Sequence, residues 1–257
     1  MTVSDDATLR VWSYSQRTMQ QWINLDTTKV LHKKDSKADE AQPRSCDFSP
    51  DGALLAVGFK SGTFRIFKTA DWSCIKQVKD PVQDGSLIED LKFSPDQRNL
   101  AVSCHNGAVC VFEFPSVTRL CKLEGSKSAI THLDWSADGE YLRVNNSSYE
   151  ILFYKLKSGV VKPMPAADLR NTEWASNTCT LSWATQGIWS GGMDGSDINH
   201  CNVSASAHAD GYKLLATADD FGFVKLFRFP SMMDNAKSLS LKGHCSHVTK
   251  VSFSGAN

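Results

Sequence analysis

Apolar and polar positions follow one pattern in four segments of the chain. Each segment opens with an apolar run, passes through a polar turn that usually carries Gly, Asn or Asp, and ends in an alternating strand that closes on an aromatic residue. The segments are LAVGFKSGTFRIF (55–67), LAVSCHNGAVCVF (100–112), LRVNNSSYEILFY (142–154) and LATADDFGFVKLF (215–227). TVSDDATLRVW at residues 2–12 is a shortened copy. Two short strands joined by such a turn are typical of a β-hairpin.

Further strands are predicted on either side of these hairpins. Three hairpins follow an apolar stretch and a tight turn, in CDFSPDG (46–52), LKFSPDQ (91–97) and LDWSADG (133–139). Proline presets φ for such a turn, and Asp and Gly tolerate its geometry. Segments after the closing aromatics, such as SCIKQVKD (73–80) and TRLCKLEG (118–125), supply a fourth strand. The pattern predicts an all-β chain of four-stranded antiparallel units.

The closing aromatics set the period of the repeat. They are Trp12, Phe67, Phe112, Tyr154 and Phe227, at intervals of 55, 45, 42 and 73 residues. A period of about 40 to 45 residues is that of WD-type propeller blades, and the apolar spacing of helical repeats is absent. We therefore predict a WD-repeat β-propeller.

The repeat divides residues 1–257, taken as a single propeller segment, into approximate blades. The predicted blades are 1–30 (partial), 43–80, 87–125, 129–165 and 197–243, with 247–257 starting a further blade and 166–196 inserted between two blades. Soluble proteins avoid the unpaired strand edges that an open set of blades would leave. We therefore expect an incomplete propeller or a fragment of a protein with tandem propellers.

Single residues also match the WD repeat. Gly243 and His244 precede the apolar VTKVSF, as the Gly-His dipeptide of WD proteins precedes an inner strand. Asp220 and Asp6 occupy the position of the turn aspartate. The expected Trp-Asp close is replaced by RVW, RIF, CVF and KLF. We therefore expect the buried His–Asp hydrogen-bond network in few blades, with packing taking its place in the others.

Larger blocks of the chain resemble one family. Residues 128–145, 172–199, 213–230 and 243–253 are similar, in order and spacing, to the echinoderm microtubule-associated protein-like family, and residues 45–64 resemble its second propeller. The resemblance implies that 172–199 connects two blades of a carboxy-terminal propeller. The signature positions of this connection are Trp174, Gly187, Trp189, Asp194 and Asp197. Ser182, Trp183 and Ser190 depart from the family pattern, so the path of the connection is expected to differ there.

The stretch NTCTLSWATQGIWSGGMDGSDIN (177–199) fits neither a helix nor a plain strand. We interpret it as a structural staple, with Ile188 and Trp189 packed against strand edges and glycines allowing the backbone to turn. A ligand pocket around Trp183 and Trp189 is the alternative, and the sequence leaves both open.

Composition narrows the class of protein. Hydrophobic residues make up 41% and charged residues 22%, which is ordinary for a globular chain. Lys plus Arg and Asp plus Glu are both 28, so the net charge of zero argues against nucleic acid and membrane surfaces as partners. No secretory signal or membrane-spanning run is recognisable. We expect an intracellular protein whose eight cysteines are reduced thiols.

Candidate catalytic and metal-binding groups are few. His200 with Cys201, and His244 with Cys245 and His247, carry zinc-ligand chemistry without a recognised four-ligand spacing. The sequence contains no nucleophile elbow, phosphate-binding glycine loop or H-E-x-x-H motif. We predict a protein that is not an enzyme and that holds no metal or cofactor.

The predicted function therefore rests on protein partners. The family resemblance implies a microtubule-associated segment that binds tubulin, located in the cytoplasm and cytoskeleton, with the axoneme or cilium included. Other proteins are expected to bind the propeller faces. Lys60, Lys127 and Lys242, in loops at blade ends, are the candidate contacts with the acidic tubulin surface. The alternative is a generic WD scaffold in a ubiquitin ligase or a ciliary assembly.

Overall fold

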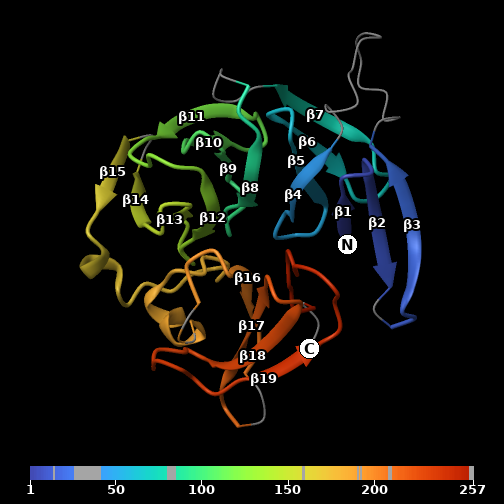
Figure 1. Cartoon of the computed structure of the whole chain (residues 1–257). Coiled ribbons are helices and arrows are strands. Elements are labelled where there is room, and N and C mark those ends of the chain that lie inside the picture. Colours follow the sequence, from blue (N-terminus) through green and yellow to red (C-terminus); the bar gives the residue numbers. More distant parts are fainter. Residues whose placement is uncertain are drawn as a thin grey trace. The chain divides into compact units, whose positions relative to one another are not determined.

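The computed structural model describes residues 1–13, 15–25, 42–79, 85–157, 160–189, 191, 193–207 and 210–254. These residues form antiparallel sheets of short strands with short 3-10 helices in one connection (Figure 1). The chain divides into two compact units, residues 1–131 with 156–161 and residues 132–155 with 162–257. Parts of the predicted blades, including 26–30 and 255–257, lie outside the described residues.

The first unit contains three antiparallel sheets whose strands follow the order of the sequence. The first is three-stranded, with β1 (Thr2–Ser4), β2 (Thr8–Ser13) and β3 (Thr18–Asn24). The second has β4 (Pro43–Phe48), β5 (Leu54–Phe59), β6 (Thr63–Lys68) and β7 (Cys74–Lys79). The third has β8 (Ile88–Phe93), β9 (Asn99–Cys104), β10 (Val109–Glu113) and β11 (Thr118–Leu123).

One local turn recurs between the first two strands of three sheets. In the β4–β5 turn, the Leu54 backbone N–H donates to Ser49 Oγ at 2.9 Å, and the Ala53 N–H donates to Asp51 Oδ1 at 3.0 Å. Ser94 and Ser136 accept the corresponding backbone N–H bonds in the later sheets, both at 2.9 Å. The Ser-x-Asp sequence therefore closes each turn through its own side chains, which explains why these turns could be recognised locally.

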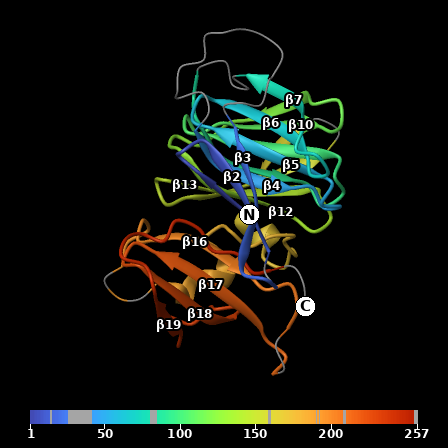
Figure 2. The same ribbon diagram turned by 90° about the vertical axis from the view of Figure 1, so that its right-hand side faces the viewer.

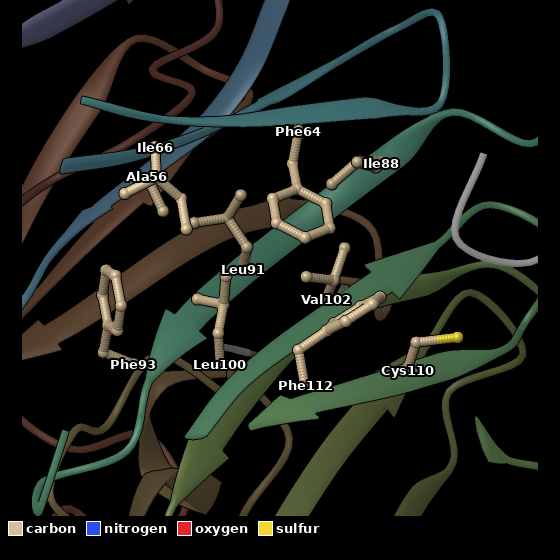
Figure 3. Close-up of a cluster of buried hydrophobic side chains, with 10 residues drawn as sticks. All are labelled: Ala56, Phe64, Ile66, Ile88, Leu91, Phe93, Leu100, Val102, Cys110 and Phe112. Atoms are coloured by element: carbon tan, nitrogen blue, oxygen red, sulfur yellow. The ribbon is translucent and has the colours of Figure 1, made fainter. Parts of the chain in front are cut away.

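One core cluster of the first unit is formed where the second and third sheets pack against each other. Figure 3 shows ten buried side chains from β5, β6, β8, β9 and β10. Phe64 of β6 and Phe112 of β10 point toward one another, with ring centroids 5.1 Å apart in an edge-to-face arrangement. The near-continuous apolar strand β5 is buried on both faces.

The second unit contains two four-stranded sheets, and the strands of each follow the order of the sequence. One has β12 (Ile130–Trp135), β13 (Tyr141–Asn146), β14 (Ile151–Lys157) and β15 (Val160–Met164), whose ends cross the division between the units. The other has β16 (Ile198–Val203), β17 (Lys213–Asp219), β18 (Phe223–Phe229) and β19 (Leu239–Lys242), which lie side by side in Figures 1 and 2.

The connection between these sheets contains two 3-10 helices, η2 (Ala166–Leu169) and η3 (Trp183–Ile188). The second of these differs from the sequence interpretation, which assigned no helix to the stretch 177–199. A helix of six residues has too few apolar positions to show a helical period. Residues 247–254 contain no assigned strand, and the prediction that a further blade begins at 247 stays a prediction.

Sheets of four antiparallel strands, repeated in sequence order, are the blades of a β-propeller. The prediction of an all-β WD-type propeller fold is confirmed.

Candidate interaction site

The connection is anchored by a buried carboxylate. Asp134 of β12 is 0% exposed, and its Oδ2 accepts hydrogen bonds from Arg143 Nε at 3.1 Å and Nη2 at 3.0 Å. The backbone N–H groups of Thr178 and Cys179 donate to the same carboxylate at 3.0 and 2.9 Å, and the Ser176 hydroxyl donates as well. A buried carboxylate is costly unless it is paired in this way, so these contacts fix the path of residues 176–179.

Asn145 of β13 continues this anchoring along the connection. Its Nδ2 donates to the Leu181 carbonyl oxygen at 3.0 Å, and its Oδ1 accepts from the Leu181 backbone N–H at 2.9 Å. The side-chain amide therefore satisfies both backbone groups of Leu181, as a neighbouring strand would.

The helix η3 brings the chain back against the last sheet. A capping box joins Ser182 and Thr185, and the Ser182 backbone N–H donates to Thr185 Oγ1 at 3.0 Å. Gly187 donates its N–H to the Ser231 carbonyl oxygen at 2.8 Å, and a Cβ at Gly187 would lie 2.2 Å from the Met233 carbonyl oxygen. Only glycine allows this approach of the two backbones.

Trp189 follows η3 and is partly buried. It packs against an apolar cluster whose members are Ile188, Ile198, Cys201, Leu215 and Phe227. Trp174, the other tryptophan of the predicted signature, forms an isolated bridge with Ser136 and receives the Arg143 guanidinium over its ring at 4.3 Å. Both residues therefore attach the connection to the sheets.

Asp194 and Asp197 form the turn that leads into β16. The Asp194 backbone N–H donates to Asp197 Oδ2 at 2.8 Å, and the Ser196 backbone N–H donates to Asp194 Oδ1 at 2.7 Å. Hydrogen bonds from the Ser196 side chain and backbone hold the pKa of Asp194 below its usual value of 3.8. The run is therefore a turn held by hydrogen bonds among its own residues.

Asp220 pairs with a histidine, and the partner is His247 instead of His244. Asp220 Oδ1 lies 2.6 Å from His247 Nδ1 and accepts a hydrogen bond from Asn199 Nδ2 at 2.6 Å. Burial opposes ionisation, but the bonds from His247 and Asn199 keep the pKa of Asp220 lowered. His244 is exposed, and its carbonyl oxygen would lie 2.7 Å from a Cβ at Gly222.

In three blades, a glycine of the hairpin turn lies close to a backbone carbonyl oxygen of a segment that packs on the turn. A Cβ at Gly62 would lie 2.7 Å from the Ser86 carbonyl oxygen, and one at Gly107 would lie 2.8 Å from that of Ser128. The contact of Gly222 with the chain at His244 is the third example. We call this part of each blade, comprising the hairpin turn and the segment packed on it, the turn end.

The three candidate lysines all belong to turn ends. Lys60 lies in the turn after β5, Lys127 lies beside Ser128, and Lys242 ends β19. Their surroundings differ. Lys60 Nζ forms an ion pair with Asp5 at 3.1 Å, and Lys242 Nζ lies 5.4 Å from the centre of the Phe223 ring. Lys127 is exposed and has no ion pair with any described residue, so its charge is the most available of the three.

A cavity of about 480 Å³ lies in the second unit beside the connection. Its aromatic lining consists of Phe153, Trp174, Trp183 and Phe229, and its charged lining consists of Arg143, Arg170, Glu173 and Lys213. Of the two tryptophans in the pocket hypothesis, Trp183 lines this cavity and is 53% exposed. Trp189 packs against the apolar cluster instead.

The candidate zinc ligands are placed in different surroundings. Cys201 is buried in the apolar cluster, while the His200 ring lies 5.7 Å from that of His132. Within the described ranges, no three His, Cys, Asp or Glu side chains are grouped as a metal site would require.

The cysteines are reduced thiols, four of them buried. No helix in the described part of the chain has the length and apolar composition to cross a bilayer.

Repeated antiparallel blades with equivalent turn ends define a WD-type β-propeller repeat protein. The family model of the echinoderm microtubule-associated protein second β-propeller matches residues 1–257. The chain belongs to this family, as the resemblance of its sequence blocks indicated.

Curated relatives carry the same family name. The human echinoderm microtubule-associated protein-like 2 is 40% identical over 248 residues, which cover 91% of this chain and 36% of that protein. The human echinoderm microtubule-associated protein-like 3 is 34% identical over 257 residues, which cover 98% of this chain and 26% of that protein. The rat echinoderm microtubule-associated protein-like 1 is 36% identical over 221 residues, which cover 84% of this chain and 26% of that protein. The chain thus spans about a quarter to a third of the length of these relatives.

The sequence interpretation missed the groups that hold the connection. Asp134, Arg143 and Asn145 interrupt the apolar strands LDW and LRVN, and a charged or amide residue in such a strand signals a buried polar contact. Their partners in the connection are 33 to 45 residues away, so the signal indicates that partners are needed but does not identify them. The stacking of Arg170 on Trp183 was likewise not anticipated.

Proposed function

We propose that this chain is a non-catalytic propeller scaffold that contributes to microtubule binding in the cytoplasmic cytoskeleton. The observation that carries the proposal is membership of the echinoderm microtubule-associated protein family over all 257 residues. The relatives named above are microtubule-associated by name.

The charge distribution supports contact through shape together with a few local lysines. The net charge is zero, so long-range attraction to an acidic surface is weak. The turn ends offer Lys60, Lys127 and Lys242 as local cations, and among the described residues Lys127 has neither the ion pair of Lys60 nor the ring contact of Lys242. A specific contact of this kind buries about 800 Å² on each partner.

Co-sedimentation with polymerised tubulin, at low and at physiological salt, tests the proposal. We expect pelleting at both salt concentrations, weaker at the higher one. Lys127→Glu should weaken pelleting more than Lys237→Glu, which makes the same charge change at an exposed position in the segment between β18 and β19. Failure of the folded wild-type chain to pellet under both conditions, together with failure of the full-length protein, would remove the assignment. A generic scaffold of a ubiquitin ligase or ciliary assembly would then be the better description.

A further inference from the structure

The cavity beside the connection has an excess of positive charge in its lining. Arg143, Arg170 and Lys213 are cationic, and Glu173 is the acidic residue. The charge of Arg143 is compensated by Asp134, whose Oδ2 lies 3.0 Å from Nη2. Arg170 and Lys213 are exposed, and neither forms an ion pair within the part of the chain that the structure describes. These two cations therefore dominate the charge that a ligand would meet.

One face of each indole ring in this cavity carries a stacked guanidinium group. Arg143 Cζ lies 4.3 Å from the centre of the Trp174 ring, and Arg170 Cζ lies 4.5 Å from that of Trp183. A cationic ligand would be repelled by these two groups and would compete with them for the ring faces on which they stack. A stacked guanidinium still directs its N–H groups outward in its own plane, where a carboxylate can accept two of them. The charge arrangement favours an anionic ligand.

Four large apolar side chains also line the cavity. Ile151, Phe153, Leu169 and Phe229 line the cavity, and Phe153 and Trp174 have ring centroids 6.0 Å apart. Lys213 is paired across the strands with Phe229, which places a cation directly beside this apolar wall. Burying one large apolar side chain here, with carboxylates at the rim, satisfies both kinds of surface.

We propose that this cavity binds an acidic peptide segment that carries a large apolar side chain between its carboxylates. The apolar side chain lies against Phe153 and Phe229, and the carboxylates contact Arg170 and Lys213. This activity goes beyond microtubule binding and uses none of the lysines assigned to it. Failure of either proposal therefore leaves the other intact.

Fluorescence anisotropy with the whole chain and a labelled, capped peptide Glu-Glu-Phe-Glu-Glu tests the proposal. Saturable binding that weakens as salt is raised is expected, because exposed charge pairs are screened. Arg170→Gln and Lys213→Gln should each weaken binding about fivefold, as for the loss of one partly exposed charge contact. Lys237→Gln removes an exposed lysine outside the cavity lining and should leave binding within about twofold of wild type.

Two control peptides separate the contributions of charge and apolar surface. Gln-Gln-Phe-Gln-Gln and Glu-Glu-Ser-Glu-Glu should each bind more weakly than the acidic phenylalanine peptide. Trp183→Ala, at an exposed position, should also weaken binding while the circular dichroism spectrum stays unchanged. The proposal is overturned if the acidic peptide does not bind, if Lys-Lys-Phe-Lys-Lys binds equally well, or if Arg170→Gln and Lys237→Gln have the same effect.

Discussion

Removing the buried carboxylate of Asp134 should destabilise the chain more than any exposed acidic substitution. Asp134→Asn keeps the shape of the side chain but removes the negative charge that faces Arg143, whose side chain is 4% exposed. It also replaces one acceptor oxygen by an N–H₂ group opposite the backbone N–H groups of Thr178 and Cys179. Each of these changes leaves a buried donor or charge without its partner.

The expected loss is about 3 to 5 kcal/mol of unfolding free energy, the range found when one member of a buried ion pair is removed. With a urea m-value of about 2 kcal/mol per molar, the midpoint of unfolding should fall by about 1.5 to 2.5 M. Urea unfolding followed by circular dichroism measures this directly. Asp168→Asn, at an exposed acidic position on η2, is the matched control and should change stability by less than about 0.5 kcal/mol.

A second substitution checks the physical reason. Arg143→Met removes the orphaned cation, so the double variant Asp134→Asn with Arg143→Met should lose clearly less than the sum of the two single losses. Additive losses, or an Asp134→Asn variant as stable as the control, would refute the interpretation that the ion pair holds the connection.

Two further substitutions test close packing and pH dependence. Gly187→Ala should cost about 1 to 3 kcal/mol in urea unfolding because its Cβ would lie 2.2 Å from a backbone carbonyl oxygen, whereas Gly191→Ala meets nothing within 4 Å and should be nearly neutral. Burial raises the pKa of Asp220, but hydrogen bonds from His247 and Asn199 outweigh it and keep this pKa below 3.8. The ionised Asp220 side chain should therefore stabilise the fold fully above pH 3.8, and this contribution should be lost as the pH falls through the lowered pKa. Asp220→Asn should flatten this part of the stability profile, and an unchanged profile would contradict the role of the carboxylate.

The repeating hairpins and their turns could be predicted because their determinants are local. Ser49 and Asp51 accept hydrogen bonds from backbone N–H groups within five residues, and the apolar pattern of a strand indicates which of its faces are buried. Gly187 and Trp189 could be named from the resemblance to the family, although their contacts could not. The sequence therefore determined the all-β class, the blade repeat and the identity of the connection.

Long-range contacts decided the rest. Asp134 and Thr178 are 44 residues apart, and nothing near either one indicates that they meet. The turn aspartate Asp220 has two candidate histidines, 24 and 27 residues further along the chain, and the packing of the chain against Gly222 selects His247 over His244. The cavity likewise depends on Arg170 and Lys213 being brought to one place by separate segments. Such arrangements arise from the balance of burial and polar satisfaction over the whole fold, which a local pattern does not encode.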